Sequence, residues 1–270
     1  MGYNGILEVS MNNDDLLKLY DGEIDLQLKT NQYLIIRNED GEIIDKKRWD
    51  GNKLVELSIQ KIKGMKWKTY KQECLADLLS NKNIPIKIIA GVPGSGKSKI
   101  SIVFGYHFIS KGEYQKIFLV RHNVGIGEKN GFLKGTKEEK IRGWLGFFED
   151  NLDDKQETIE EMCSSGSLVL EGVEYIKGRD LKNSWILIDE CEDLSEDQFK
   201  VIGERVSYGS SICFVGDYDQ VTQEKYKNSN GLKRAIRTLA GNPLCGIIVF
   251  DNKETDNVRS ETSKVFSSIY

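Results

Sequence analysis

The sequence predicts an α/β fold: a mostly parallel central sheet flanked by helices, plus a small β-rich N-terminal extension. From residue 65 onward, short apolar runs alternate with helical stretches, which is typical of strand–helix–strand units in a parallel sheet. Before residue 65, "QYLIIRN" and "EIIDKKRW" flank Asp40-Gly41, and Asp-Gly between two strand-like runs predicts a hairpin. We therefore expect an extension over residues 1–64 and one main domain over residues 65–270.

The elements follow from local pattern. In the extension, "MNNDDLLKLYDG" predicts one short helix that Asn or Asp can cap and Gly22 can end. Apolar runs predict strands at 85–90, 116–121, 168–176, 185–189, 211–216 and 246–250. The stretches between these runs predict helices at 70–80, 97–110, 136–150, 154–164, 195–206, 229–240 and 256–268. A capping box starts the helix at Ser195, because Gln198 follows three residues later.

Composition restricts the functional classes. The net charge of −4 excludes binding of nucleic acid through bulk positive charge, so any such contact must use a local basic face. The sequence has no apolar run long enough to cross a bilayer and no signal-peptide pattern, so we expect a cytoplasmic protein without a membrane partner. Five scattered cysteines and two histidines make a zinc site or a disulfide unexpected.

One motif carries the first chemical prediction. Within "KIIAGVPGSGKSKIS", residues 91–98 match G-x-x-x-x-G-K-S, between an apolar strand and a helix whose N-terminal amides attract phosphate. We expect Lys97 to reach the β- and γ-phosphates and the Ser98 hydroxyl to hold Mg²⁺. The predicted phosphate-binding residues are Gly91, Val92, Pro93, Gly94, Ser95, Gly96, Lys97, Ser98 and Lys99.

Two further motifs follow later strands. In "WILIDE", Asp189 can complete the Mg²⁺ shell and Glu190 can polarise a water for in-line attack. In "CFVGDYDQ", the amide of Gln220 can bond the γ-phosphate or the attacking water. The guanine-reading sequence Asn-Lys-x-Asp of switch GTPases is absent. Three motifs in this order predict a RecA-like P-loop enzyme that uses ATP and Mg²⁺.

Residues 65–270 resemble the PhoH-like ATPases, which are relatives of superfamily-one RNA helicases. The resemblance is carried by "VRHNVGIGEKNGFLKGTKEEKIRGWLGFFEDNL", "VEYIKGRDLKNSWILIDECEDLSEDQFK", "NSNGLKRAI" and "DNVRSE". It implies action on RNA, with single-stranded RNA as the expected partner. Residues 1–64 resemble the segment that joins a PIN ribonuclease domain to the ATPase in longer members. A PIN carboxylate set is not visible, so we expect no ribonuclease activity here, and a separate nuclease or other protein is a candidate partner.

The chain departs from the family pattern at several positions. Glu192 stands where the family has glutamine, which bears on how hydrolysis couples to nucleic acid. His122 replaces a proline, Lys177 replaces an arginine, and Ser98 replaces a threonine. The resemblance also implies that Gln72 reads adenine, and the alternative is a helical glutamine facing solvent.

A basic stretch and one arginine leave alternatives open. "KIKGMKWKTYK" (61–71) combines five lysines with Trp67 and Tyr70, which suits contact with RNA or a solvated linker. Arg259 in "DNVRSE" suits an arginine finger or a surface ion pair. Since too few residues follow residue 250 for another domain, such a finger would reach a neighbour's site. That implies a homo-oligomer, as a head-to-tail ring.

The sequence thus predicts an ATP-binding and ATP-hydrolysing PhoH-like protein that acts on RNA as a helicase-like ATPase. Two other classes remain. One is a nucleotide-gated regulatory or binding protein with little turnover, and the other is a different nucleic-acid motor, such as a viral packaging ATPase.

Overall fold

The computed structural model describes residues 2–121, 156–217, 230–252 and 254–260. The chain forms two compact units. The first unit comprises Met1–Ser95 and Arg234–Tyr270, and the second comprises Gly96–Lys233. The chain passes from the second unit back to the first within helix α7 (Gly231–Leu239).

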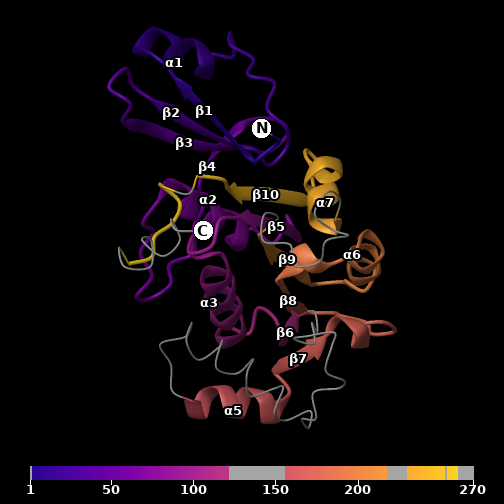
Figure 1. The fold of residues 1–270 in the computed structure, drawn as a ribbon. Coiled ribbons are helices and arrows are strands. Elements are labelled where there is room, and N and C mark those ends of the chain that lie inside the picture. The colour runs from indigo at the N-terminus through magenta and orange to yellow at the C-terminus, as the bar shows by residue number, and fades with distance from the viewer. Residues whose placement is uncertain (1, 122–155, 218–229, 253, 261–270) are drawn as a thin grey trace. The chain divides into compact units, whose positions relative to one another are not determined.

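A four-stranded sheet opens the first unit (Figure 1). Its strands are β1 (Ile6–Ser10), β2 (Tyr33–Arg37), β3 (Ile43–Trp49) and β4 (Leu54–Glu56), in the order β1-β2-β3-β4. β1 runs parallel to β2, whereas β2–β3 and β3–β4 are antiparallel. Helix α1 (Asn13–Tyr20) begins where the Asn12 side chain accepts a hydrogen bond from the Asp15 amide, and Leu19 joins the small core over β2. The predicted hairpin and helix of the β-rich extension are confirmed.

The rest of the first unit brings α2 (Tyr70–Ser80) against two parallel strands, β5 (Ile86–Gly91) and β10 (Cys245–Phe250). Ile88 pairs with Ile247, and the register continues to Gly91 beside Phe250. The Thr69 side chain caps α2 by accepting from the Gln72 amide. The carboxyl end of β5 is thereby held by both β10 and α2.

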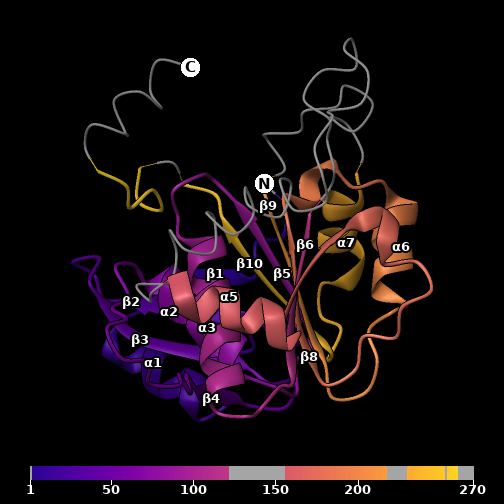
Figure 2. The same cartoon turned by 90° about the horizontal axis from the view of Figure 1, so that it is seen from below.

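The second unit is a parallel sheet in the order β9-β8-β6-β7 with helices on both faces (Figure 2). Its strands are β6 (Lys116–Arg121), β7 (Leu168–Gly172), β8 (Ser184–Asp189) and β9 (Ser211–Gly216). Figure 2 shows α3 (Lys97–Ser110) and α5 (Gln156–Ser165) on one side and α6 (Glu196–Gly203) on the other. Two 3₁₀ turns, η1 (Val173–Tyr175) and η2 (Cys191–Asp193), follow β7 and β8. The Ser195–Gln198 capping box is present.

An aromatic cluster fixes α3 to β8. The Trp185 ring lies 5.1 Å from the Phe108 ring, and its indole N–H donates to the Ser101 carbonyl at 3.1 Å. Gly105 permits this approach, because a Cβ there would lie 2.5 Å from the Trp185 ring. This packing sets the start of α3 relative to the end of β8, where predicted site residues lie.

The described pairings among β5 to β10 are all parallel, and the predicted RecA-like α/β class with a mostly parallel central sheet is confirmed. Two element predictions are wrong. The strand predicted at 168–176 ends at Gly172, because the chain turns there into η1. Residues 256–260 are not helical, since long-range contacts direct this backbone: the Val258 amide donates to the Gly94 carbonyl.

Some predictions are not tested. The helix predicted at 136–150 and His122 lie outside the described residues. The division between residues 64 and 65 stays a prediction. Within the described parts of the chain, no helix combines the length and apolar character needed to cross a membrane.

Candidate functional site

The first half of the P-loop, Gly91–Ser95, lies in the first unit and leaves β5 as a tight turn. Gly91 has φ +118°, and a Cβ there would lie 2.0 Å from the Phe250 carbonyl oxygen of β10. The Val92 amide donates to that same oxygen at 2.8 Å. The Ser95 hydroxyl donates back to the Val92 carbonyl at 3.0 Å. The glycine and the neighbouring strand therefore set the shape of this turn.

Gln72 supports the same turn from α2. Its Nε2 donates to the Ser95 carbonyl at 2.9 Å, and its Oε1 accepts from the Lys68 amide at 2.8 Å. The side chain is buried, so the alternative of a solvent-facing glutamine is wrong. Adenine recognition by Gln72 stays a prediction.

The second half of the P-loop begins α3 in the second unit. Gly96 is the N-cap residue, with φ 88°, a left-handed conformation that glycine adopts readily. Because Gly96 has no side chain, no capping group competes with a phosphate for the first amides of α3. Lys97 is buried, Ser98 is partly buried and Lys99 is exposed on this first turn.

The predicted Mg²⁺ ligands lie together. The Ser98 hydroxyl at the start of α3 donates to Asp189 Oδ1 at the end of β8, at 2.9 Å. A hydroxyl and a carboxylate oxygen in contact fit Mg²⁺, which takes one or two protein oxygens beside phosphate oxygens and water. Arg121 at the end of β6 donates to the other carboxylate oxygen, Oδ2, through Nε at 3.2 Å and Nη2 at 2.5 Å. Arg121 was not among the predicted site residues, because its place at the end of an apolar run does not show which strand lies beside it.

Lys97 lies among three carboxylates of the second unit. Burial lowers the pKa of its ammonium group, and the charges of Asp217, Glu192 and Asp189 oppose that shift. Buried opposite charges of this kind stabilise the cation that the P-loop requires. The arrangement places one lysine where the phosphate-binding helix meets the ends of β8 and β9.

Glu192 is the least expected member of this group. It is 8% exposed, and burial raises its pKa from 4.5 to about 7. Its Oε2 accepts from the Asp217 amide at 3.0 Å, and a Cβ on Gly216 would lie 2.3 Å from this oxygen. Glu192 therefore links η2 to the end of β9. The sequence marked this position only as a departure from glutamine.

Glu190 differs from the residues around it. Its backbone is left-handed, with φ 55° and ψ 40°, which is uncommon outside glycine and marks a sharp turn directly after β8. Asp189 is buried whereas Glu190 is exposed, so the two carboxylates have different environments. The role of Glu190 as a base stays a prediction. Gln220 lies outside the described residues.

Arg259 is placed in the first unit, against the P-loop of its own chain. A Cβ on Gly94 would lie 2.7 Å from Arg259 Cγ and 2.6 Å from Asn257 Oδ1. Gly94, with φ +79°, is therefore glycine for two reasons, its conformation and this close approach. The sequence analysis considered Arg259 as an arginine finger for a neighbouring chain or as a surface ion pair, and it did not predict this contact with Gly94 of the same chain.

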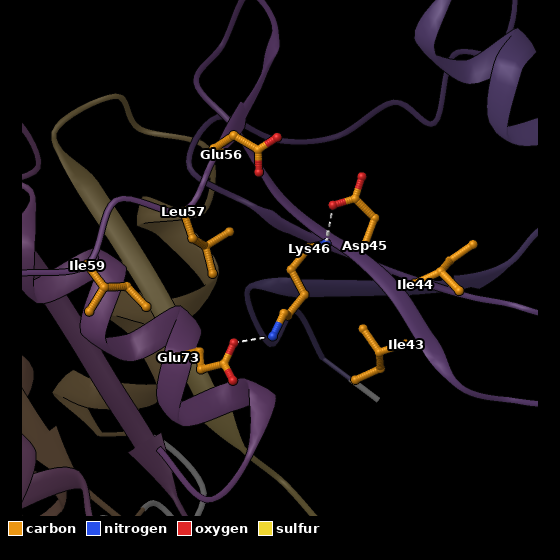
Figure 3. Close-up of a pocket in the computed structure, with 8 residues that line it drawn as sticks. All are labelled: Ile43, Ile44, Asp45, Lys46, Glu56, Leu57, Ile59 and Glu73. Atoms are coloured by element: carbon orange, nitrogen blue, oxygen red, sulfur yellow. Dashed lines mark hydrogen bonds and ion pairs between the residues drawn. The ribbon is translucent and has the colours of Figure 1, made fainter. Parts of the chain in front are cut away.

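A cavity of about 400 Å³ lies elsewhere in the first unit, between β3 and α2 (Figure 3). It is lined by residues 43–46, Glu56, Leu57, Ile59 and Glu73. Lys46 forms an ion pair with Glu73, and the Lys46 amide donates to the Asp45 carboxylate. None of the predicted site residues lines this cavity.

Comparison with known proteins gives a consistent result. A family model described as "PhoH-like protein" matches residues 64–270. "Protein PhoH2" of Bacillus subtilis is 30% identical over 233 residues, which cover 81% of this chain and 52% of that protein. A "PhoH-like protein" of the same organism is 31% identical, covering 63% of this chain and 53% of its own length. The chain thus spans about half the length of these curated relatives. Since the family model matches most of the sequence, the chain belongs to the PhoH-like protein family.

Proposed function

We propose that this chain binds ATP with Mg²⁺, hydrolyses the ATP and acts on RNA. The family is a nucleotide-binding P-loop family, which supports the first part at a coarse level. The hydrogen bond from Ser98 to Asp189 carries the proposal, because it joins the predicted metal-side residue of the P-loop to that of the later strand. An incidental glycine-rich turn would not require this pairing.

The proposed roles follow from charge and position. Lys97 binds the β- and γ-phosphates, while Ser98 and Asp189 hold Mg²⁺. The metal supplies positive charge that offsets the phosphate oxygens. Arg121, already bonded to Asp189, orients that carboxylate.

Hydrolysis needs a group that takes the proton of the attacking water. Glu190 is proposed as this base, because it is an exposed carboxylate directly after the metal-side aspartate. Gln220 is proposed to sense the terminal phosphate, Arg259 to stabilise its charge, and Gln72 to select adenine.

Action on RNA is the finer part of the proposal. It is supported by Lys61, Lys63, Lys66 and Lys68, which are exposed and alternate with partly buried residues that include Trp67. Lys71 is buried, so it does not belong to that surface. A homo-oligomer and a separate nuclease or other protein partner stay predictions, as does a cytoplasmic location.

The test is ATP turnover by the purified chain with no nucleic acid, single-stranded RNA, duplex RNA or duplex DNA. We expect stimulation by single-stranded RNA and loss of turnover in Lys97→Ala. Turnover that depends on duplex DNA would instead indicate another class of motor. Turnover unchanged in Lys97→Ala would refute the P-loop assignment.

A second candidate is a nucleotide-gated protein with little turnover. Glu192 favours it, because a buried carboxylate replaces the family glutamine beside the catalytic motif. Tight ATP binding without turnover under all four conditions would support this second candidate.

A further inference from the structure

A buried ion-pair cluster anchors the segment that follows β10 in the first unit. Lys71, in the first turn of α2, donates from Nζ to Asp251 at 2.6 Å and to Asp256 at 2.7 Å. The side chains of Lys71 and Asp256 are only 4% and 1% exposed. Charges buried to this degree persist in proteins when they are paired and hydrogen-bonded, and breaking such a pair is costly.

Asp256 also closes a turn in this segment. Its carboxylate accepts from the Asn252 amide at 3.0 Å, and its own amide donates to the Asn252 carbonyl at 2.9 Å. The Asn252 side chain accepts from the amides of Glu254 and Thr255. The protein's own contacts therefore fix the path of the chain into Asn257.

After this turn, residues 257–259 pack against the P-loop at Gly94. The Val258 amide donates to the Gly94 carbonyl at 3.1 Å, and the Arg259 amide donates to Asn257 Oδ1 at 3.1 Å. The ideal Cβ position of Gly94 lies 2.7 Å from Arg259 Cγ and 2.8 Å from Cδ. The aliphatic stem of Arg259 therefore packs on the phosphate-binding turn, and the guanidinium, attached at Cδ, is within reach of that turn.

The same helical turn of α2 holds the P-loop itself. Gln72, the next residue after Lys71, donates to the Ser95 carbonyl. One end of α2 thus fixes both the phosphate-binding turn and the arginine segment that lies on it. An arginine in a surface ion pair would not need a buried anchor such as the Lys71 cluster. The ion pairs found among the described residues do not include Arg259.

We propose that Lys71 is a positioning residue that holds Arg259 over the P-loop of its own chain, where Arg259 contacts the phosphates of the nucleotide bound there. This proposal rests on the proposed function, since it requires a nucleotide in the P-loop. It assigns Arg259 to its own chain's site and not to a neighbour's. The cation would interact most with the terminal phosphate, where negative charge is greatest.

The test measures binding by calorimetry, with ADP and a non-hydrolysable ATP analogue as probes. We expect Arg259→Ala to weaken binding of the analogue about 10-fold or more, and of ADP less, because hydrogen bonds to charged groups are the strong ones. Arg237→Ala is the matched control: it removes an exposed arginine of the same unit, on α7, and should leave both affinities unchanged.

Lys71→Met and Asp256→Asn test the anchor. Each should weaken binding of the analogue, and neither should weaken it further in the Arg259→Ala background, because the anchor acts through Arg259. Breaking the buried pair lowers the melting temperature under either role, whereas a merely structural role would also add its effect on binding in the Arg259→Ala background. Lys71→Met leaves a buried aspartate unpaired, so Asp256→Asn, which keeps the side-chain shape, provides the milder variant if the first does not fold.

Several outcomes would overturn the proposal. Unchanged affinity for the analogue in Arg259→Ala, or additive effects of Lys71→Met and Arg259→Ala, would do so. Recovery of turnover on mixing Arg259→Ala with Glu190→Gln protomers would show that Arg259 serves a neighbouring chain. A wild-type chain that binds neither probe would refute the proposed function itself, and this proposal with it.

Discussion

Replacing Glu192 with glutamine should stabilise the protein at alkaline pH much more than at acidic pH. Burial raises the pKa of this carboxyl from 4.5 to about 7. Between these values the folded chain keeps the proton that the unfolded chain releases. The contribution of Glu192 to the free energy of unfolding is therefore fully present below pH 4.5, and it is lost as the pH rises toward 7.

The magnitude follows from the same shift. One pKa unit corresponds to about 1.4 kcal/mol, so the full cost of ionising Glu192 in the folded chain is about 3 kcal/mol above pH 7. Integrating the linkage relation from pH 5.5 to pH 8 gives a loss of about 2 kcal/mol. Glutamine does not ionise, and its Oε1 can still accept from the Asp217 amide, so Glu192→Gln should avoid this loss.

The assay is thermal unfolding at pH 5.5 and pH 8, with EDTA and without nucleotide. For a chain of this size, about 2 kcal/mol corresponds to a melting-temperature difference of roughly 4–8 °C. We expect the gain of Glu192→Gln over wild type to be larger by that amount at pH 8. Glu190→Gln, the same change at an exposed position two residues away, is the control and should follow wild type. An equal gain at both pH values, or a larger one at pH 5.5, would refute the reasoning.

Four other predictions concern the nucleotide site and its support. Lys97→Ala should abolish tight ATP binding, measured by calorimetry, because the phosphates lose their buried cation. Glu190→Gln should bind ATP normally but turn over about 10²-fold more slowly, and a collapse of binding would mean that Glu190 is structural. Asp189→Asn, in contrast, should weaken Mg²⁺-dependent binding. Gly105→Ala should destabilise the chain by about 1–3 kcal/mol in denaturant unfolding, because its Cβ would lie 2.5 Å from the Trp185 ring; an unchanged midpoint would contradict this packing.

Local sequence pattern was enough to predict most of the strands and helices of this fold. The alternation of apolar runs and helices predicted the parallel strands, and the Asp40-Gly41 turn and Ser195–Gln198 capping box predicted features within a few residues of themselves. Such signals depend on φ/ψ preference and side-chain period, which short windows of sequence contain. The same windows misjudged residues 173–175, which form a 3₁₀ turn, and residues 256–260, where a contact with the distant Gly94 directs the backbone.

The sequence also predicted which residues the nucleotide site would use, because motif spacing after a strand places particular side chains at the strand's carboxyl end. It predicted Ser98 and Asp189 as ligands of one Mg²⁺ ion, and these two side chains, 91 residues apart, are in contact. It could not predict that Arg121 bonds the same carboxylate, because that contact depends on β6 being the neighbour of β8 in the sheet.

Tertiary structure alone decided how the supporting charges behave. The same carboxyl group is an ordinary acid at the surface, and at Glu192 it has a pKa near 7 because η2 and Gly216 enclose it. Lys71 lay within a lysine-rich stretch that suited contact with RNA or a solvated linker, yet it is buried and paired with two aspartates about 180 residues later. Burial and pairing depend on which distant segments meet, and a sequence window holds only one side of each such contact.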